Sequence, residues 1–200
     1  MRRLDLFPTP LWVWNLPKHE QYSDSIMEWV KENCDEEGRW QSQTNIQTLE
    51  EFEPLCSHLL KLCRKVSKQL GHDLKKYGEL KISAGWVNRT TVHTYAQESH
   101  THPNNVLSAI YYVKTPVGMG KTVFTDPRPA AGVIVPRPER NNALNGMKQV
   151  FNSNEGMLVV FPSFLPHRVS PGVEDGERIT VSFNITFENS DLMALPLWGE

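Results

Sequence analysis

Two histidines separated by a single residue could form part of a metal site. They are His100 and His102, in the stretch ESHTHPNN that begins at Glu98. In an extended chain the side chains at positions i and i+2 point to the same face, so both imidazoles could reach one ion. A metal site needs at least one further ligand from elsewhere in the chain. Without such a ligand, the pair could equally be two ordinary loop histidines.

His167 is the candidate for that further ligand. It lies in the stretch FPSFLPHRVSPG, where it follows an apolar run and begins a new strand after a turn. An isolated turn histidine is the alternative interpretation. His93 lies in an apparent strand at an odd separation from His100, which suits a shared centre less well and leaves open a role behind the ligands. The other histidines lie in or beside expected helices, at the surface or at helix ends: His19, His58 and His72.

The stretch RITVSFN, which begins at Arg178, alternates between polar and apolar residues. If its apolar face packs under helices, its polar face lines the interior of a β-sandwich. A buried arginine is costly without an acidic side chain or an anionic ligand, and a small dicarboxylate would pair with it bidentately, assisted by a Ser or Thr hydroxyl. An outward-facing arginine on an edge strand is the alternative. The polar face carries Arg178, Thr180, Ser182 and Asn184, and the apolar face carries Ile179, Val181, Phe183 and Ile185.

The segments that would position these residues follow one another closely after Lys81. Short runs of strand-forming residues alternate with turn residues, and no helical pattern separates them. This density of strands indicates an antiparallel sandwich or jelly roll. The expected strands are residues 82–90, 92–96, 107–114, 121–126, 149–153, 156–163, 167–171 and 178–187, with an earlier strand at 11–14.

Two amphipathic segments precede this β region. Apolar residues recur at helical spacing over residues 22–33 and 48–70, and the second stripe ends at Gly71. We expect both helices to pack against a sheet. The sequence therefore predicts a mainly β protein, a jelly roll supported by two or three α-helices.

The 200 residues fit a single domain with a substantial core. We expect the strand and helices of residues 1–80 to support a jelly-roll core at 81–188. Residues 127–146 contain several prolines and glycines and no strand or helix pattern. An irregular loop of this length is uncommon unless it is functional or disordered, so this segment is a candidate lid.

Composition argues against several classes of partner. The 21 basic and 23 acidic residues include no basic block suited to phosphates, so we expect no nucleic-acid partner. Cys34, Cys56 and Cys63 are odd in number and suit free thiols in a reducing cytoplasm. Asp5 and Pro8 interrupt the apolar start of the chain, which lacks the pattern of a signal peptide or a membrane span. The expectation is a cytoplasmic protein without a membrane partner.

Several of these motifs resemble those of the Fe(II)- and 2-oxoglutarate-dependent oxygenases, which have the double-stranded β-helix fold. LSAIYYVK is similar to the strand of the prolyl hydroxylase branch that carries a 2-oxoglutarate-binding tyrosine, here Tyr112. MLVVFPSFLPHRVSP resembles the strand and turn that deliver the distal metal ligand, here His167. RITVSFN resembles the strand whose arginine pairs with the far carboxylate of 2-oxoglutarate, here Arg178, with Ser182 as the assisting hydroxyl. The likeness covers residues 86–187. Within it, the stretches HTHPNN, SAIYYV and FTDPR resemble segments of oxygenases found in bacteria and their phages.

The resemblance implies Fe(II), 2-oxoglutarate and O2 as cofactor and co-substrates. It also implies hydroxylation of an amino acid, a peptide or a protein side chain, with release of succinate and CO2. The residues expected around 2-oxoglutarate are Arg178, Tyr112, Ser182, Asn184 and Ser108, and those offered to a small-molecule or peptide substrate are Arg128 and Asn104.

The expected metal site departs from the resembled family at His102. Most of the superfamily has an Asp or Glu at this position. All three histidines could bind the metal, since neutral imidazoles suit Fe(II). His100 and His167 could bind it with water in the third place, because HTHPNN also resembles the His-Thr-Gly-Pro-x-Asn stretch of aspartyl hydroxylases. Alternatively, His102 and His167 could be the ligands, with His100 outside the coordination shell.

Two other functions fit part of the same pattern. A cupin-type three-histidine dioxygenase would need no 2-oxoglutarate, but it leaves Tyr112, Arg178 and Ser182 without a role. A non-catalytic jelly-roll binding protein would make the histidines incidental. Outside these motifs, the tryptophans of residues 12–14 and Trp198 could cover the edge of a site or form a homodimer contact.

Overall fold

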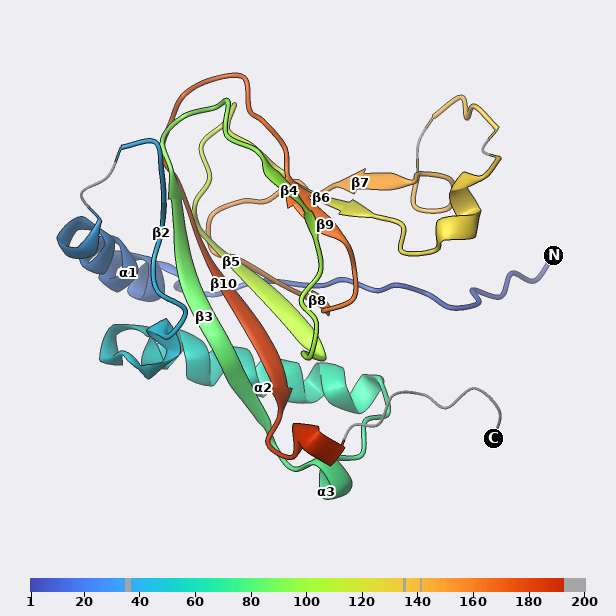
Figure 1. Ribbon diagram of the computed structural model, residues 1–200, viewed down its shortest axis with the longest axis horizontal. Helices are drawn as coiled ribbons and strands as arrows, with labels where there is room; N and C mark the ends of the chain where they lie inside the picture. The colour runs from blue at the N-terminus through green and yellow to red at the C-terminus, as the bar shows by residue number, and fades with distance from the viewer. Residues whose placement is uncertain (35–36, 135, 141, 193–200) are drawn as a thin grey trace.

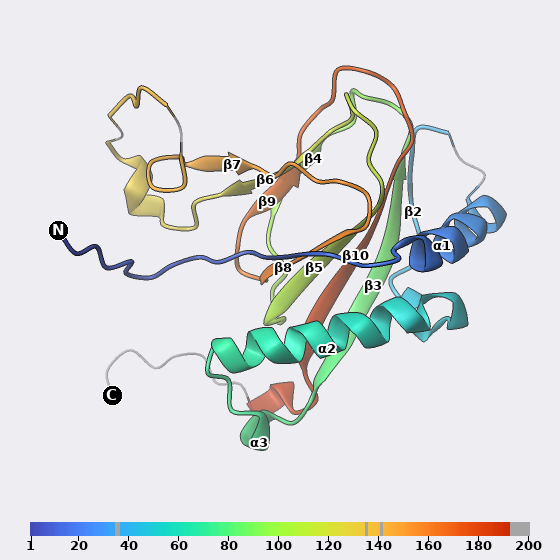
Figure 2. The same cartoon turned by 180° about the vertical axis from the view of Figure 1, so that it is seen from behind.

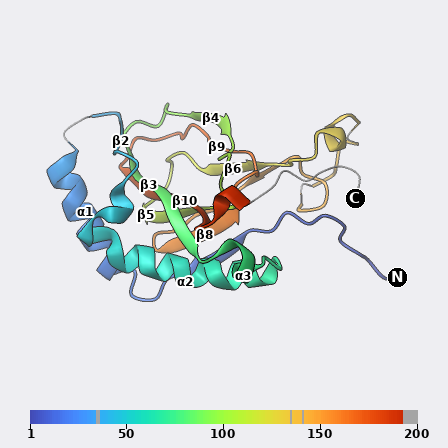
Figure 3. The same cartoon turned by 60° about the horizontal axis from the view of Figure 1, so that its bottom comes forward.

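Helices and two β-sheets form three layers (Figure 3). Helices α1 (Glu20–Asn33) and α2 (Glu53–Gln69) cover one face of the larger sheet, and the smaller sheet lies on its other side. The structure is a computed structural model, and the residues that it describes are 1–34, 37–134, 136–140 and 142–192.

The larger sheet has six strands in the order β1-β8-β5-β10-β3-β2, and each neighbouring pair is antiparallel (Figure 1). β10 runs between β3 and β5, so its residues have cross-strand partners on both sides. The strands of this sheet are β1 (Trp12–Asn15), β2 (Arg39–Gln41), β3 (Leu80–Thr90), β5 (Leu107–Lys114), β8 (Met157–Pro162) and β10 (Arg178–Phe187).

The smaller sheet has four strands in the order β4-β9-β6-β7. Two antiparallel sheets that face each other, with helices behind one of them, confirm the predicted double-stranded β-helix. The strands are β4 (Gln97–His100), β6 (Thr122–Thr125), β7 (Lys148–Val150) and β9 (His167–Val169). The short helices are α3 (Leu74–Tyr77) and the 3-10 turns Ile46–Thr48, Glu50–Phe52, Pro129–Gly132 and Ser190–Leu192.

The apolar face of β10 packs against the helices, as the alternation of its residues predicts. Burying one aliphatic or aromatic side chain in such a core contributes roughly 1.5–3 kcal/mol to stability. The polar face of β10, with Arg178 and Thr180, is thereby directed toward the smaller sheet. The shared core cluster includes Ile179, Val181, Phe183 and Ile185 of β10, Ile26 of α1, and Leu55 and Leu59 of α2.

The prediction of a strand at residues 92–96 is wrong. His93 and the next residue form a turn, and β4 begins only at Gln97. Asp175 Oδ1 accepts hydrogen bonds from the backbone N–H and from Nδ1 of His93, at 2.8 and 2.7 Å. This contact between distant parts of the chain overrides the local β propensity.

The boundaries of the second helix also differ from the expectation. α2 begins at Glu53 rather than at residue 48, and two 3-10 turns precede it. Pro54 lies in its first turn, where a missing N–H costs little because that group has no partner within the helix. Strand β2 and helix α3 were not predicted, because three or four residues are too few to show a period.

Two segments extend from one side of the molecule, namely residues 1–10 and the connection between β6 and β7 (Figures 1 and 2). That connection contains the candidate lid at 127–146. None of its described residues lines the cavity between the sheets, so its role as a lid stays a prediction. The division into a supporting segment at 1–80 and a core at 81–188 also stays a prediction.

The remaining general expectations concern thiols, membranes and assembly. Among the described residues, no disulfide bond involves Cys34, Cys56 or Cys63. Within the described ranges, no helix combines the length and the apolar character needed to cross a bilayer. Trp12 packs against the main core, and Trp198 lies outside the described residues, so the homodimer contact stays a prediction.

Candidate active site

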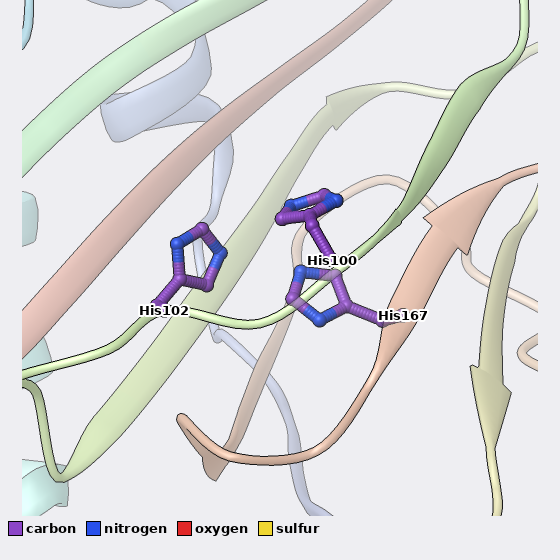
Figure 4. A group of neighbouring side chains, drawn as sticks. All are labelled: His100, His102 and His167. Carbon is purple, nitrogen blue, oxygen red and sulfur yellow. The ribbon is translucent and has the colours of Figure 1, made fainter.

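The imidazoles of His100, His102 and His167 form one cluster (Figure 4). His100 ends β4, His102 follows it in the chain, and His167 begins β9. His100 and His167 are antiparallel cross-strand partners, which explains how the distal histidine reaches the pair. One ring nitrogen from each residue lies within 4.8 Å of the others. The structure therefore brings together the three histidines that the sequence singles out.

Two of the rings are held by backbone carbonyl groups. Nδ1 of His100 lies 2.8 Å from the carbonyl oxygen of Glu98, and Nδ1 of His167 lies 3.0 Å from that of Leu165. Because a carbonyl oxygen only accepts, each Nδ1 carries the proton and donates it. Nε2 of both rings is left with a free lone pair, which is the state that a metal ligand requires.

Burial keeps two of the rings neutral. It lowers the pKa of both His102 and His167 to about 4, and the charge of the nearby His100 acts in the same direction. Phe161 and Phe124 contribute to the burial of His167, since their ring centroids lie 4.8 and 6.1 Å from its own. At neutral pH the imidazoles of His102 and His167 are uncharged. Imidazole nitrogens suit Fe(II) among other divalent metals.

His102 is linked to a chain of polar side chains. Its Nδ1 lies 3.5 Å from Nδ2 of Asn184, and Oδ1 of Asn184 accepts a hydrogen bond from Ser108 Oγ at 3.2 Å. Ser108 Oγ lies 2.9 Å from Ser163 Oγ. A side-chain amide offers a donor at one end and an acceptor at the other. If Oδ1 faces His102, it accepts from Nδ1–H and leaves Nε2 of that ring for a metal.

A cavity between the sheets connects the histidine cluster to Arg178. Its empty space, counted out to the mouth, is about 630 Å³. The three histidines, Arg178 and Thr180 are among the residues that line it.

Arg178 is a buried cation without a carboxylate partner among the described residues. Its side chain is 6% exposed, and Nη1 lies 3.5 Å from Thr180 Oγ1. Burial lowers the pKa of its guanidinium, an effect that the nearby Tyr112 and Tyr95 oppose. Because an unpaired buried charge is unfavourable, this end of the cavity is suited to an anion.

The other residues predicted around the co-substrate differ in position. Ser108 and Ser182 line the cavity, and Asn184 contacts His102 behind it. Tyr112 is fully buried, and its hydroxyl lies 2.8 Å from Oγ1 of Thr122, which does line the cavity. Tyr112 therefore lies one side chain behind the surface of the cavity.

The residues predicted to meet the substrate lie elsewhere. Arg128 forms an ion pair with Asp126 at 2.7 Å in the connection that follows β6, and it is not among the residues around the cavity. Asn104 is exposed in a turn, with a positive φ of 65°. His93 pairs with Asp175 and is not part of the histidine cluster. None of these three residues is among the described residues that line the cavity.

Sequence reasoning did not single out most of the residues around the cavity, Thr180, Trp86, Asn88 and Thr122 among them. Thr180 was recognised only as part of the polar face of β10, although its position two residues after Arg178 is a usable signal. The other three residues are separated in sequence from any motif, so only the folded structure places them in the site. These residues are Trp86, Asn88 and Thr122.

A protein-family model matches residues 84–184, about half of the chain. Its description is "Putative 2OG-Fe(II) oxygenase", where 2OG stands for 2-oxoglutarate. The description names the two cofactors that the sequence motifs predict. The matched range contains the histidine cluster and Arg178. No curated protein matches the chain significantly.

Solved structures share the fold at low sequence identity. A prolyl-4-hydroxylase from Pseudomonas putida is 14% identical, with a TM-score of 0.62 over 89% of this chain and 92% of that one. The viral collagen prolyl hydroxylase of Paramecium Bursaria Chlorella virus-1, solved as a 2OG complex, is 12% identical, with a TM-score of 0.58 over 88% and 94%. SnoN, an alpha ketoglutarate dependent epimerase from nogalamycin biosynthesis, is 13% identical, with a TM-score of 0.62 over 89% and 78%. At these identities the likeness supports the fold.

Proposed function

Because the chain belongs to the 2OG-Fe(II) oxygenase family, we propose that it oxidises a small molecule, a peptide or a protein side chain with Fe(II), 2-oxoglutarate and O2. Hydroxylation is the proposed outcome, with succinate and CO2 as the other products. One observation carries the proposal. Arg178, which lacks a carboxylate partner in the described part of the chain, borders the same cavity as the histidine cluster.

Each part of the site has a distinct task in this proposal. His100, His102 and His167 would hold the metal through one nitrogen each. Arg178 would pair with the far carboxylate of 2-oxoglutarate, with the Thr180 hydroxyl beside it. When bound, Fe(II) and 2-oxoglutarate supply the O2-dependent oxidation.

The remaining polar residues would support these contacts. Ser108 and Ser182 line the cavity and are proposed contacts of the co-substrate. Tyr112 would orient Thr122 through their hydrogen bond. Asn184 would orient His102.

All three histidines are the preferred ligand set, because their nitrogens lie close to one another. If only two of the histidines bound the metal, the third imidazole would face the metal without binding it. The cupin-type alternative uses the same histidines, but it gives the buried Arg178 no ligand. Hydroxylation needs a separate test, because one protein with this fold, SnoN, is described as an epimerase.

Metal and co-substrate are expected to stabilise the protein in two steps. Without O2, Fe(II) should raise the melting temperature, and 2-oxoglutarate at a hundred times its Kd should raise it by a further amount of about 5–10 °C. Differential scanning fluorimetry measures both shifts. A response to metal alone would favour the cupin-type dioxygenase, and no response to either would favour the non-catalytic binding protein.

Product analysis tests the outcome of the reaction. The protein loaded with Fe(II) is expected to form succinate from 2-oxoglutarate, and pooled metabolites and peptides that contain the substrate should accelerate this turnover. Mass spectrometry of the stimulating pool should show a gain of one oxygen atom. A product of unchanged mass, or one that lacks two hydrogen atoms, would replace hydroxylation with another oxidative outcome.

Asn184 is expected to control the metal affinity of the site through His102. With Oδ1 of Asn184 turned toward His102, Asn184→Leu removes the acceptor for Nδ1–H and should weaken metal binding by about 10–100-fold. Asn184→Asp can only accept from the ring and should retain the affinity. Isothermal titration with Mn(II) measures both. Ser83→Ala is the matched control, because Ser83 Oγ bonds to the backbone oxygen of Asn184 and not to its amide. Equal affinities for the Leu variant and the unmodified protein would contradict the assigned role.

A further inference from the structure

Besides Arg178, the residues around the cavity include Arg39, Arg89 and Arg168, and Arg39 lies in the same row of the larger sheet as Arg178. Cross-strand pairing places Arg178 of β10, Thr90 of β3 and Arg39 of β2 in one row across the larger sheet. Side chains in one such row point to the same face. Arg39 is therefore on the face that turns toward the smaller sheet, and it lines the same cavity as Arg178 and the histidine cluster.

Arg39 is exposed at the mouth of this cavity. Its guanidinium carbon lies 5.0 Å from the centroid of the Tyr95 ring, a geometry that permits a cation–π contact. No ion pair of Arg39 occurs within the part of the chain that the structure describes. A cation that rests on an aromatic ring keeps its hydrogen-bond donors available for an anion.

The other charges near the cavity do not neutralise Arg39. Glu177 is already bonded to Arg89 and Lys114, at 2.8 and 2.7 Å. Arg168 also borders the cavity, although its pairing with Val123, next to the inward pair His167 and Phe124, starts its side chain on the outer face of the smaller sheet. Among the described residues around the cavity there is no Asp or Glu.

The charges in the loaded site leave an excess of positive charge. A divalent metal and the guanidinium groups of Arg178 and Arg39 together carry four positive charges, and the 2-oxoglutarate dianion supplies two negative ones. Three neutral histidines add none, whereas a carboxylate in place of His102 would remove one. This excess positive charge, with Arg39 at the exposed mouth, favours binding of a further anion there.

We infer that the substrate carries a carboxylate and that Arg39 binds this group at the mouth of the cavity. This inference rests on the proposed function. Trp86 lines the same wall, with its ring 5.7 Å from the ring of His102, and together with Tyr95 it offers aromatic surface to the apolar part of the substrate. The carboxylate would hold the substrate at the mouth, and its remaining atoms would extend toward the histidine cluster.

Binding to an unreactive complex tests this inference. Ni(II) replaces Fe(II), and 2-oxoglutarate is present at saturation, so that the metal and Arg178 are already occupied. Isothermal titration then compares two matched pairs of probes, benzoate with benzamide and 3-phenylpropionate with 3-phenylpropionamide. Each carboxylate is expected to bind at least tenfold more tightly than its amide, and added salt should weaken this preference.

Variants of Arg39 test whether this residue causes the preference for a carboxylate over an amide. Arg39→Gln is expected to lower carboxylate affinity at least tenfold and leave amide affinity unchanged, and Arg39→Lys should restore part of the loss. Arg64→Gln is the matched control, because Arg64 is an exposed arginine of α2 that pairs with Glu79. None of these variants should change the affinity for 2-oxoglutarate.

The same titrations separate two kinds of failure. If the Ni(II) protein does not bind 2-oxoglutarate, the proposed function fails and this inference fails with it. If 2-oxoglutarate binds but the carboxylates do not exceed their amides, or neither binds, only the inference is overturned. Undiminished carboxylate binding by Arg39→Gln also overturns it.

Discussion

Arg178→Met is expected to abolish succinate formation while metal binding survives. The guanidinium is the proposed partner of the far carboxylate of 2-oxoglutarate, and methionine replaces its length without its charge. Removing one partner of a buried charge pair costs roughly 2–5 kcal/mol, which corresponds to a loss of affinity of about 30-fold to several thousand-fold. Isothermal titration with 2-oxoglutarate and a succinate assay measure the loss, and titration with Mn(II) checks that the histidine cluster is intact.

The stability of the same variant distinguishes a ligand-binding arginine from a structural one. Without ligand, Arg178 is an unpaired buried cation, so Arg178→Met should leave the melting temperature unchanged or raise it. Arg89→Met is the matched control, because Arg89 is bonded to Glu177 at 2.8 Å. That variant should lower the melting temperature. Arg89 also borders the cavity, but its guanidinium is bonded to Glu177, so 2-oxoglutarate affinity should fall far less than in Arg178→Met. Normal turnover in Arg178→Met would refute the assignment of the co-substrate pocket.

Local alternation was sufficient to predict the central strand and its two faces. A strand has a period of two residues, so the sequence from Arg178 to Asn184 already separates the residues of the core from those of the cavity. The family resemblance then gave the polar face its proposed ligand. The strand boundaries were predicted well for the same reason, because β10 is ten residues long and shows several periods.

The residues that surround the site could not be predicted from the local alternation of polar and apolar residues. Asn184 meets His102 across 82 positions of the sequence, and Arg39 reaches the cavity on an edge strand of three residues. Such contacts depend on strand order and register, and neither leaves a local pattern. The turn at His93 is a further example, because the carboxylate that holds it comes from Asp175.

His102→Ala is expected to reduce metal affinity by at least 100-fold if all three histidines bind the ion. The variant removes one of three neutral nitrogens, and its two remaining ligands hold a divalent metal less firmly. His93→Ala is the matched control, because His93 is bonded to Asp175 and lies outside the cluster. Isothermal titration with Mn(II) compares the two. Unchanged metal affinity and full turnover in His102→Ala would mean that His100 and His167 suffice.

His102→Asp tests why a neutral ligand occupies this position. The variant places a carboxylate ligand beside His100 and His167, so it should bind metal and retain part of the turnover. It also lowers the charge of the metal centre by one unit, which should weaken the binding of 2-oxoglutarate and of a carboxylate substrate. If His102→Asp binds benzoate as tightly as the unmodified protein in the Ni(II) complex, the charge of the metal centre does not contribute to substrate choice, and Arg39 alone would have to account for it.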